Sequence, residues 1–130
     1  MKPVISRCCF ACGPDNPIGL KLDIEGDGKR VTTRFRPRRE HEGWEGMLHG
    51  GIIATLLDEL VAWICKKNGI DALTAKLEIR YRKPARIGEE LLAYAELVEY
   101  RGRIVKAKAR VVGTKEETVA EADALLLRGA

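Results

Sequence analysis

The sequence predicts an α+β domain in which one long central helix is wrapped by a curved antiparallel sheet of about five to six strands. Only residues 52–67 combine helical hydrophobic spacing with the length of a helix. Short alternating segments precede this helix and four long ones follow it, and alternation of apolar and polar residues indicates strands. Strands of about ten residues are long enough to curl round a single helix.

Two short strands are expected before the helix, at residues 20–25 and 30–36, with a Gly-Asp-Gly hairpin turn between them. The segment 90–100 would also suit a helix, but Arg101-Gly102 joins it tightly to the alternating segment that follows. The strands expected after the helix are residues 72–82, 90–100, 103–112 and 117–127.

The N-terminal part of the chain is predicted to be irregular. Residues 8–19 are rich in Gly, Pro, Asn and Asp, which favour turns. No internal repeat or low-complexity linker divides the sequence. We therefore expect a single domain over residues 1–130, with residues 1–19 as its N-terminal lead.

Composition narrows the class of protein. The 130 residues are 45% hydrophobic and 32% charged, which is typical of a soluble globular domain. The uncharged stretch 46–57 is too short to cross a bilayer, and no secretory signal opens the chain, so we expect a cytoplasmic protein. Aromatic residues are only 5% of the chain, which disfavours base stacking and a nucleic-acid partner. The net charge of +4 suits either a solvated surface or attraction of a polyanionic ligand.

The helix has two unlike faces. Its large apolar residues form one stripe that is expected to face the sheet: Ile52, Ile53, Leu56, Leu57, Leu60 and Ile64. The opposite face carries small side chains around one carboxylate: Gly51, Ala54, Thr55, Asp58, Ala62 and Cys65. A helix without a charged outer face is generally buried on both sides. We therefore expect a second subunit or a substrate to cover this face.

Helical phase selects Asp58 as the candidate catalyst. A lone helical Asp is more often solvated or a cap, but an unpaired carboxylate in an apolar groove is functionally poised. Glu59 falls about 100° away beside Trp63, where it can be solvated or paired. Upstream, unpaired glycine amides in His49-Gly50-Gly51 would stabilise an oxyanion at the positive helix end. The alternative is a plain flexible entry to the helix, with His49 as a loop or core residue.

Three segments now identify a family resemblance. HGGIIATLLDE (residues 49–59) resembles the characteristic motif of hotdog-fold acyl-CoA thioesterases, particularly the phenylacetate-degradation type. CFACGPDNPIGLKL (residues 9–22) is similar to the start of many proteins of that group, and LEIRYRKPARIGEEL (residues 77–91) is similar to the strand after their helix.

The resemblance implies hydrolysis of an acyl-CoA thioester by a homodimer with edge-to-edge sheets, commonly paired into a homotetramer. It implies that Asp58 acts as general base or nucleophile and that the Gly51 backbone N–H polarises the thioester carbonyl. His49 would orient the entry loop or contact substrate. Gly50 and Thr55 would contact the coenzyme A part of the substrate, and no separate cofactor or metal is expected.

Two further groups of charged residues are site candidates. Relatives carry Gln or Asn in the loop before HGG, whereas the nearest match here is Glu42, an acid that would supply a second base or repel Asp58. Arg80, Arg82 and Lys83 would bind the nucleotide phosphates, or simply form a solvated strand face.

The cysteines leave a separate question. Cys9 and Cys12 have the spacing of a zinc knuckle, but a structural zinc site needs four ligands and the chain has no second CxxC. Two chains could each donate Cys9 and Cys12 and so supply four zinc ligands across an interface. A turn with reduced thiols is the simpler interpretation, and a redox CxxC would need a strand–CxxC–helix context that is missing.

Other functions remain open at this stage. A hotdog dehydratase or hydratase would need a His paired with an acid, and His41 and His49 are the only histidines. An acyl-CoA-binding sensor would keep the groove without turnover, and a structural protein would use the small helix face for assembly only. The acyl group cannot be read from the sequence, although four residues would suit an apolar pocket or a core: Trp44, Trp63, Met47 and Leu48.

Overall fold

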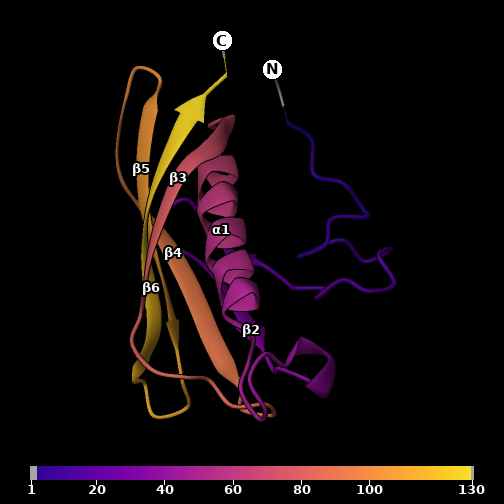
Figure 1. Cartoon of the computed structure of the whole chain (residues 1–130). Coiled ribbons are helices and arrows are strands. Elements are labelled where there is room, and N and C mark those ends of the chain that lie inside the picture. The colour runs from indigo at the N-terminus through magenta and orange to yellow at the C-terminus, as the bar shows by residue number, and fades with distance from the viewer. Residues whose placement is uncertain (1–2, 130) are drawn as a thin grey trace.

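A computed structural model, which describes residues 3–129, confirms the predicted fold class: one long helix packs on one face of an antiparallel sheet (Figure 1). Within these residues the sheet has six strands in the order β1-β2-β4-β5-β6-β3, and every pairing is antiparallel. The strands are β1 (Glu25–Gly26), β2 (Val31–Phe35), β3 (Ala72–Tyr81), β4 (Leu91–Arg101), β5 (Ile104–Val112) and β6 (Thr118–Arg128). A short 3-10 helix, η1 (Arg39–His41), lies between β2 and the long helix.

The long helix α1 spans Gly50–Lys67 and has a defined signal at each end. His49 is the N-cap residue, and its ring nitrogen accepts a hydrogen bond from the Gly51 backbone N–H. At the C-terminus, Gly69 has a φ of +70°, and Gly69 and Ile70 donate to the carbonyl oxygens of Lys66 and Cys65. This is a Schellman motif, which needs a residue that tolerates the left-handed region.

The strand expected at residues 20–25 is largely absent, because only Glu25 and Gly26 pair with β2. The backbone N–H groups of Leu20 and Leu22 instead donate to the carbonyl oxygens of Phe10 and Ala11 in the N-terminal lead. Lys21 between them has a φ of +53°, which breaks an extended strand. The alternation of Leu20 and Leu22 therefore reflects burial beneath the lead and not membership of the sheet.

The core lies between α1 and the sheet. The helix contributes large fully buried side chains: Leu56, Leu57, Leu60, Val61 and Ile64. The facing positions of the central strands are mostly alanine, namely Ala93, Ala95, Ala107, Ala109, Ala120, Ala122 and Ala124. Small residues on the sheet allow a helix with large residues to approach closely, so complementary sizes fill the interior.

The helix is covered on two sides. Figure 1 shows α1 between the sheet and the N-terminal lead, whose Ala11 is buried in the core. Cys65, which helical phase assigned to the outer face, is also buried in the core, so that expectation was wrong. The Schellman turn brings Ile70, which is also buried in the core, back to the Cys65 carbonyl oxygen.

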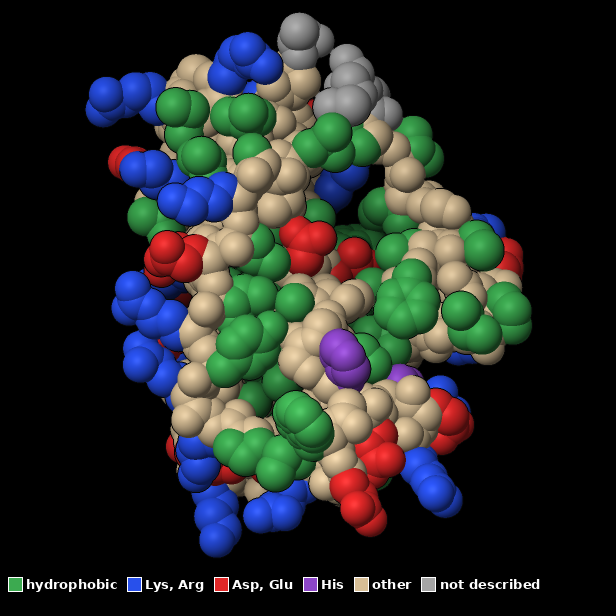
Figure 2. Space-filling model, in the orientation of Figure 1, with side chains coloured by type: hydrophobic (Ala, Val, Ile, Leu, Met, Phe, Trp, Pro, Cys, Tyr) green, Lys and Arg blue, Asp and Glu red, His purple; other side chains and the backbone are tan. Residues whose placement is uncertain are grey.

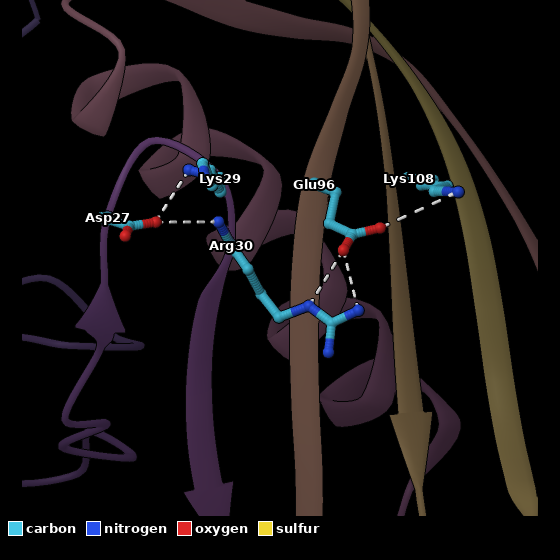
Figure 3. Close-up of polar contacts among 5 residues, drawn as sticks. All are labelled: Asp27, Lys29, Arg30, Glu96 and Lys108. Carbon is cyan, nitrogen blue, oxygen red and sulfur yellow. Dashed lines mark hydrogen bonds and ion pairs between the residues drawn. The ribbon is translucent and has the colours of Figure 1, made fainter.

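Charged residues cover the outer face of the sheet. Glu96 on β4 lies between Arg30, 2.7 Å away, and Lys108 on β5, 3.8 Å away (Figure 3). The neighbouring Asp27 accepts hydrogen bonds from the backbone N–H groups of Lys29 and Arg30, and these bonds lower the pKa of its carboxyl. The alternating Lys, Arg and Glu residues therefore form ion pairs on a solvated surface, as the sequence indicated.

Two other features bear on assembly and location. β3 is an outer strand of the sheet, so one of its backbone edges has no strand partner within residues 3–129. A membrane-crossing helix, which must be long and apolar, does not occur in the described part of the chain.

Candidate active site

A cavity of about 930 Å³ opens at the N-terminal end of α1. Its walls come from the loop before the helix, the helix start and the segment after β3, and they include Glu42, Trp44, Met47, Leu48, His49, Gly50, Gly51, Tyr81, Arg82 and Lys83. The volume lies in the range of small-molecule sites. Most of the segment that the sequence singled out before the helix therefore faces one cavity.

The cavity wall is largely apolar and partly exposed. Trp44 is 83% exposed, and Met47 and Leu48 lie beside it in the same loop. In Figure 2 hydrophobic side chains gather down the middle of the viewed face, with many Lys and Arg side chains along the edge that the sheet forms. Trp63, the fourth residue expected at an apolar pocket, contributes instead to a separate cavity beneath the N-terminal lead.

The first turn of α1 differs from its expected form at Gly51. The Gly51 N–H donates to His49 Nδ1, 2.8 Å away, so this amide is not free to bind a carbonyl oxygen. The adjacent Gly50 N–H has no hydrogen-bond partner among the described residues and lines the cavity. The exposed His49 ring, with its Nδ1 as the acceptor, is therefore the helix cap.

Tyr81 is a residue of this region that the sequence analysis missed. Its hydroxyl donates to the Gly50 carbonyl oxygen, 2.8 Å away, and joins the end of β3 to the first turn of α1. The aromatic ring is 53% exposed and lines the cavity. Its strand position gave a partial signal, because it alternates with Ile79 and Leu77 on the helix side of β3.

Asp58 lies two turns further along α1, where its side chain is exposed. It is not part of the cavity wall, and its side chain makes no hydrogen bond or ion pair with any other described residue. Thr55 is also outside the cavity, and its hydroxyl donates to the Gly51 carbonyl oxygen within the helix. A single chain therefore separates the candidate carboxylate from the candidate carbonyl-binding amide.

Glu59, which helical phase placed beside Trp63 as either solvated or paired, is hydrogen-bonded to Trp63. Its Oε2 accepts a hydrogen bond from Trp63 Nε1, 3.2 Å away. Cys9 of the lead places its sulfur 3.7 Å from the same oxygen. We expected a second subunit or a substrate to cover the small face, but the N-terminal lead also lies over part of it, because Ala62 lines a cavity together with Cys9 and Cys12.

The remaining acid of the region, Glu42, lies in the cavity wall. Its Oε2 accepts a hydrogen bond from the Gly46 backbone N–H, 2.6 Å away, which holds the loop 42–48 closed. Glu42 and Leu48 also face each other as an isolated bridge pair. The carboxylate that replaces the expected amide therefore has a structural partner on its own loop.

The three basic candidates occupy different surroundings. Arg80 lies on the outer face of the sheet and pairs with Glu78 at 3.8 Å. Arg82 lines the cavity, but its guanidinium lies 2.6 Å from Glu121 and lowers the pKa of that carboxyl. Lys83 lines the cavity and forms no ion pair within the described residues.

Neither histidine contacts a carboxylate in the described part of the chain. His41 is buried, its Nδ1 accepts a hydrogen bond from the Arg38 N–H, and burial lowers the pKa of its ring. His49 Nδ1 is occupied by the Gly51 N–H. The His–acid pair that a dehydratase would need is therefore not formed within this chain.

These features define the class of protein. A long helix on one face of a six-stranded antiparallel sheet, within residues 3–129, is the hotdog fold, here with a cavity at the helix N-terminus. The chain belongs to the thioesterase superfamily, whose pattern matches residues 45–120. This confirms the family that the HGG motif suggested.

Similar proteins agree with this assignment. Acyl-coenzyme A thioesterase 13 from Homo sapiens is 31% identical over 101 residues, which are 76% of this chain and 72% of that protein. The smu.793 protein of Streptococcus mutans, solved bound to acetyl CoA, superposes with a TM-score of 0.79 at 24% identity, over 84% of this chain and 89% of the other. The PaaI protein of E. coli, from the phenylacetic acid degradation operon, superposes with a TM-score of 0.79 at 21% identity. The superposition covers 85% of this chain and 81% of that protein.

Proposed function

We propose that the protein hydrolyses acyl-coenzyme A thioesters to a free acid and coenzyme A. Membership of the thioesterase superfamily supports the reaction class. The human relative is named an acyl-coenzyme A thioesterase, and the Streptococcus mutans protein of the same fold was solved bound to acetyl CoA. The observation that carries the proposal is the cavity of about 930 Å³ at the helix N-terminus, with an unpartnered amide in its wall.

In the proposed mechanism Asp58 is the general base. Its carboxylate removes a proton from water, and the water oxygen attacks the carbonyl carbon of the thioester. The carbonyl oxygen becomes an oxyanion that the helix N-terminus stabilises. The C–S bond then breaks, and the coenzyme A thiolate takes a proton, so that free acid and thiol are released.

We assign the oxyanion-binding amide to Gly50 in place of Gly51. The Gly51 N–H already donates to His49, whereas the Gly50 N–H is unpartnered among the described residues. The hydrogen bond from the Tyr81 hydroxyl to the Gly50 carbonyl oxygen joins the first turn of α1 to the end of β3, which supports a fixed helix N-terminus for this role. His49 is then a positioning residue that caps the helix and does not touch the reacting atoms.

The distance along α1 favours an active site built from two chains. Gly50 and Asp58 are eight residues apart, about 12 Å along a helix axis. A single chain would therefore hold the carbonyl oxygen far from its own carboxylate. We propose that each site takes the helix N-terminus from one subunit and Asp58 from the other.

The unpaired edge of β3 supports a dimer of this kind. It is an outer strand of ten residues, and an open edge of that length readily pairs with a second chain. Pairing two β3 edges would give a continuous sheet and bring the neighbouring helices together. A homodimer is therefore our proposed assembly, and the family resemblance implies that two such dimers pair into a homotetramer.

For the coenzyme A phosphates we propose Lys83 as the first contact. It lines the cavity and has no competing carboxylate among the described residues, whereas Arg82 and Arg80 are paired with Glu121 and Glu78. Arg82 could exchange one partner for another, because guanidinium groups also bind phosphate well. Arg80 is the weakest of the three candidates, because it lies on the far face of the sheet.

Thiol release tests the proposed function. Purified protein is mixed with phenylacetyl-, hydroxybenzoyl-, short-chain and medium-chain acyl-CoAs, and free coenzyme A is measured. Wild type is expected to turn over at least one class, and Asp58→Asn to lose at least about 100-fold in kcat, because general-base catalysis contributes about that much. Asp123→Asn, a matched change at an exposed Asp on β6, is expected to leave the rate unchanged.

Other outcomes would favour the competing functions. If wild type binds these acyl-CoAs without releasing thiol, the protein is a sensor and the enzymatic proposal is wrong. If Glu42→Gln abolishes turnover and Asp58→Asn does not, the base is the acid in the cavity wall. A change in double-bond absorbance without free thiol would indicate a dehydratase.

A further inference from the structure

Two thiols and one carboxylate converge beneath the N-terminal lead. Cys9 and Cys12 come from the lead and Glu59 comes from α1, fifty residues further along the sequence. One ligand atom from each residue lies within 4.8 Å of the other two, and all three side chains are half-buried. Within residues 3–129 this is the one group of three or more His, Cys, Asp or Glu residues with metal-binding geometry.

The distances suit a tetrahedral ion. Zinc binds sulfur at about 2.3 Å and carboxylate oxygen at about 2.0–2.2 Å, so a sulfur and an oxygen on one tetrahedral ion are about 3.5 Å apart. The sulfur of Cys9 lies 3.7 Å from Glu59 Oε2. An ion could therefore enter between these atoms with small side-chain adjustments.

The lead forms a turn that holds both sulfurs in place. The Cys12 backbone N–H donates to the Cys9 sulfur at 3.4 Å, and the Gly13 N–H donates to the Cys9 carbonyl oxygen at 2.8 Å. A Cβ atom at Gly13 would lie 2.3 Å from the Cys9 nitrogen, so only glycine fits this position. The turn presents two ligands from four residues, as a zinc knuckle does.

The helix holds the third ligand. Trp63 Nε1 donates to Glu59 Oε2 at 3.2 Å and so orients the carboxylate. A hydrogen-bonded outer partner of this kind orients a metal ligand. Lys66, further along the helix, pairs with Asp71 at 3.1 Å, and Glu59 forms no ion pair among residues 3–129.

The same surroundings disfavour a reactive thiol. Burial, and then the hydrogen bond with Glu59, raise the pKa of Cys12 to about 12. A nucleophilic or redox role would need the opposite shift, and a bound metal ion would have to displace the thiol proton.

We propose that Cys9, Cys12 and Glu59 bind one Zn²⁺ ion per chain, with a water molecule as the fourth ligand. Both thiols release their protons to solvent when the ion binds, so the ligands become two thiolates and one carboxylate. The ion fastens the N-terminal lead to α1 one residue after Asp58. The site has three protein ligands, one fewer than a fully protein-liganded structural zinc site, and its water completes the tetrahedron. It is independent of the proposed thioesterase reaction.

Metal titration of the full chain tests this site. The protein is stripped with a chelator under reducing conditions and titrated with Zn²⁺ and, separately, with Co²⁺. One equivalent of Zn²⁺ is expected, with near-ultraviolet thiolate-to-Co²⁺ absorbance in the cobalt form. At a hundredfold excess of Zn²⁺ over its Kd, the Tm is expected to rise by on the order of 10 °C.

Variants separate the three ligands from bystanders. Cys9→Ser and Cys12→Ser are expected to weaken Zn²⁺ binding at least about 100-fold, and Glu59→Gln at least about 10-fold. Glu59→Gln keeps a hydrogen-bond acceptor for Trp63, so the fold is expected to stay intact. Weaker Zn²⁺ binding in this variant would therefore report the loss of a ligand. Cys8→Ser is the matched control, because Cys8 is exposed and outside the cluster.

Three outcomes overturn the proposal. The first is a wild type that binds no more Zn²⁺ than Cys12→Ser does. The second is a Zn²⁺ affinity of Glu59→Gln equal to that of wild type. The third is a loss of Zn²⁺ affinity in Cys8→Ser as large as the loss in Cys12→Ser.

Discussion

The Nδ1 atom of His49 accepts a hydrogen bond from the Gly51 backbone N–H at 2.8 Å, and this contact determines which amide of the helix N-terminus is free. Because Gly51 is occupied, the available donor is Gly50, the first residue of α1. Our proposal therefore assigns the oxyanion-binding role expected of Gly51 to Gly50, and His49 is the helix cap.

Replacing Gly50 with proline tests the oxyanion assignment. Proline lacks an N–H but suits the first position of a helix, and the preceding His49 has the extended backbone (φ −60°, ψ 131°) that proline requires. We expect Gly50→Pro to lower kcat by about 10²–10³-fold at an unchanged Tm. Gly50→Ala keeps the N–H and has ordinary space for its Cβ, so it is expected to stay active. Equal activity in both variants would exclude this amide.

The capping role of His49 predicts a stability effect that a small polar residue rescues. His49→Ala is expected to lower the free energy of unfolding by about 1 kcal/mol, because the Gly51 N–H loses its acceptor. His49→Asn supplies a cap oxygen and is expected to recover most of this loss and of the activity. Urea denaturation of the three proteins measures the effect. An active His49→Ala with unchanged stability would contradict the capping role.

Lys83 is expected to contribute to KM through the nucleotide. Lys83→Ala should raise KM for an acyl-CoA by about tenfold, since a charged contact with phosphate is worth about 1.5 kcal/mol or more. The same variant should leave KM unchanged for the matching acyl-N-acetylcysteamine, which lacks the nucleotide. Lys29→Ala, at an exposed Lys far from the cavity, is the control. A higher KM for both the acyl-CoA and the acyl-N-acetylcysteamine would instead indicate damage to the acyl pocket.

Stability is expected to fall as the pH drops below about 6.5. Burial lowers the pKa of the His41 ring beneath this ordinary value, so the unfolded chain binds a proton that the folded chain does not. The free energy of unfolding keeps falling until the pH reaches the pKa of His41 in the folded protein. Above about pH 6.5 this effect is absent. Urea midpoints at pH 8 and pH 5.5 should differ in wild type and differ less in His41→Gln. The same difference is expected between His49→Asn and the double variant His41→Gln/His49→Asn, in which the second imidazole is absent.

Much of the fold could be predicted because hydrophobic periodicity records burial directly. Four strands were predicted to within one residue of β3, β4, β5 and β6, and the helix began only two residues earlier than expected. The strand at residues 20–25 was wrong, because alternation also arises where a loop buries every second side chain. Nothing in the local sequence shows that Leu20 pairs with Phe10 or that Lys21 has a positive φ.

The site was less predictable, because its contacts join distant segments. The sequence indicated the loop before the helix and the helix N-terminus as one region, and the cavity there includes Glu42, His49 and Gly50. It could not show that a His49 ring nitrogen accepts a hydrogen bond from the Gly51 N–H, because this bond depends on one side-chain rotamer. It also could not show that Cys9 contacts Glu59, fifty residues away, or that Tyr81 donates a hydrogen bond to Gly50.

The central claim is that each active site combines Gly50 of one chain with Asp58 of another, and mixed dimers test it most directly. Asp58→Asn and Gly50→Pro, each inactive alone, are unfolded together, refolded at equal concentration and tested for thiol release. Half of the resulting dimers contain one chain of each kind, and each of these has one intact site out of two, so about a quarter of wild-type activity is expected. Activity no higher than that of the separate variants, in a mixture shown to have exchanged subunits, would mean that both residues must act from the same chain.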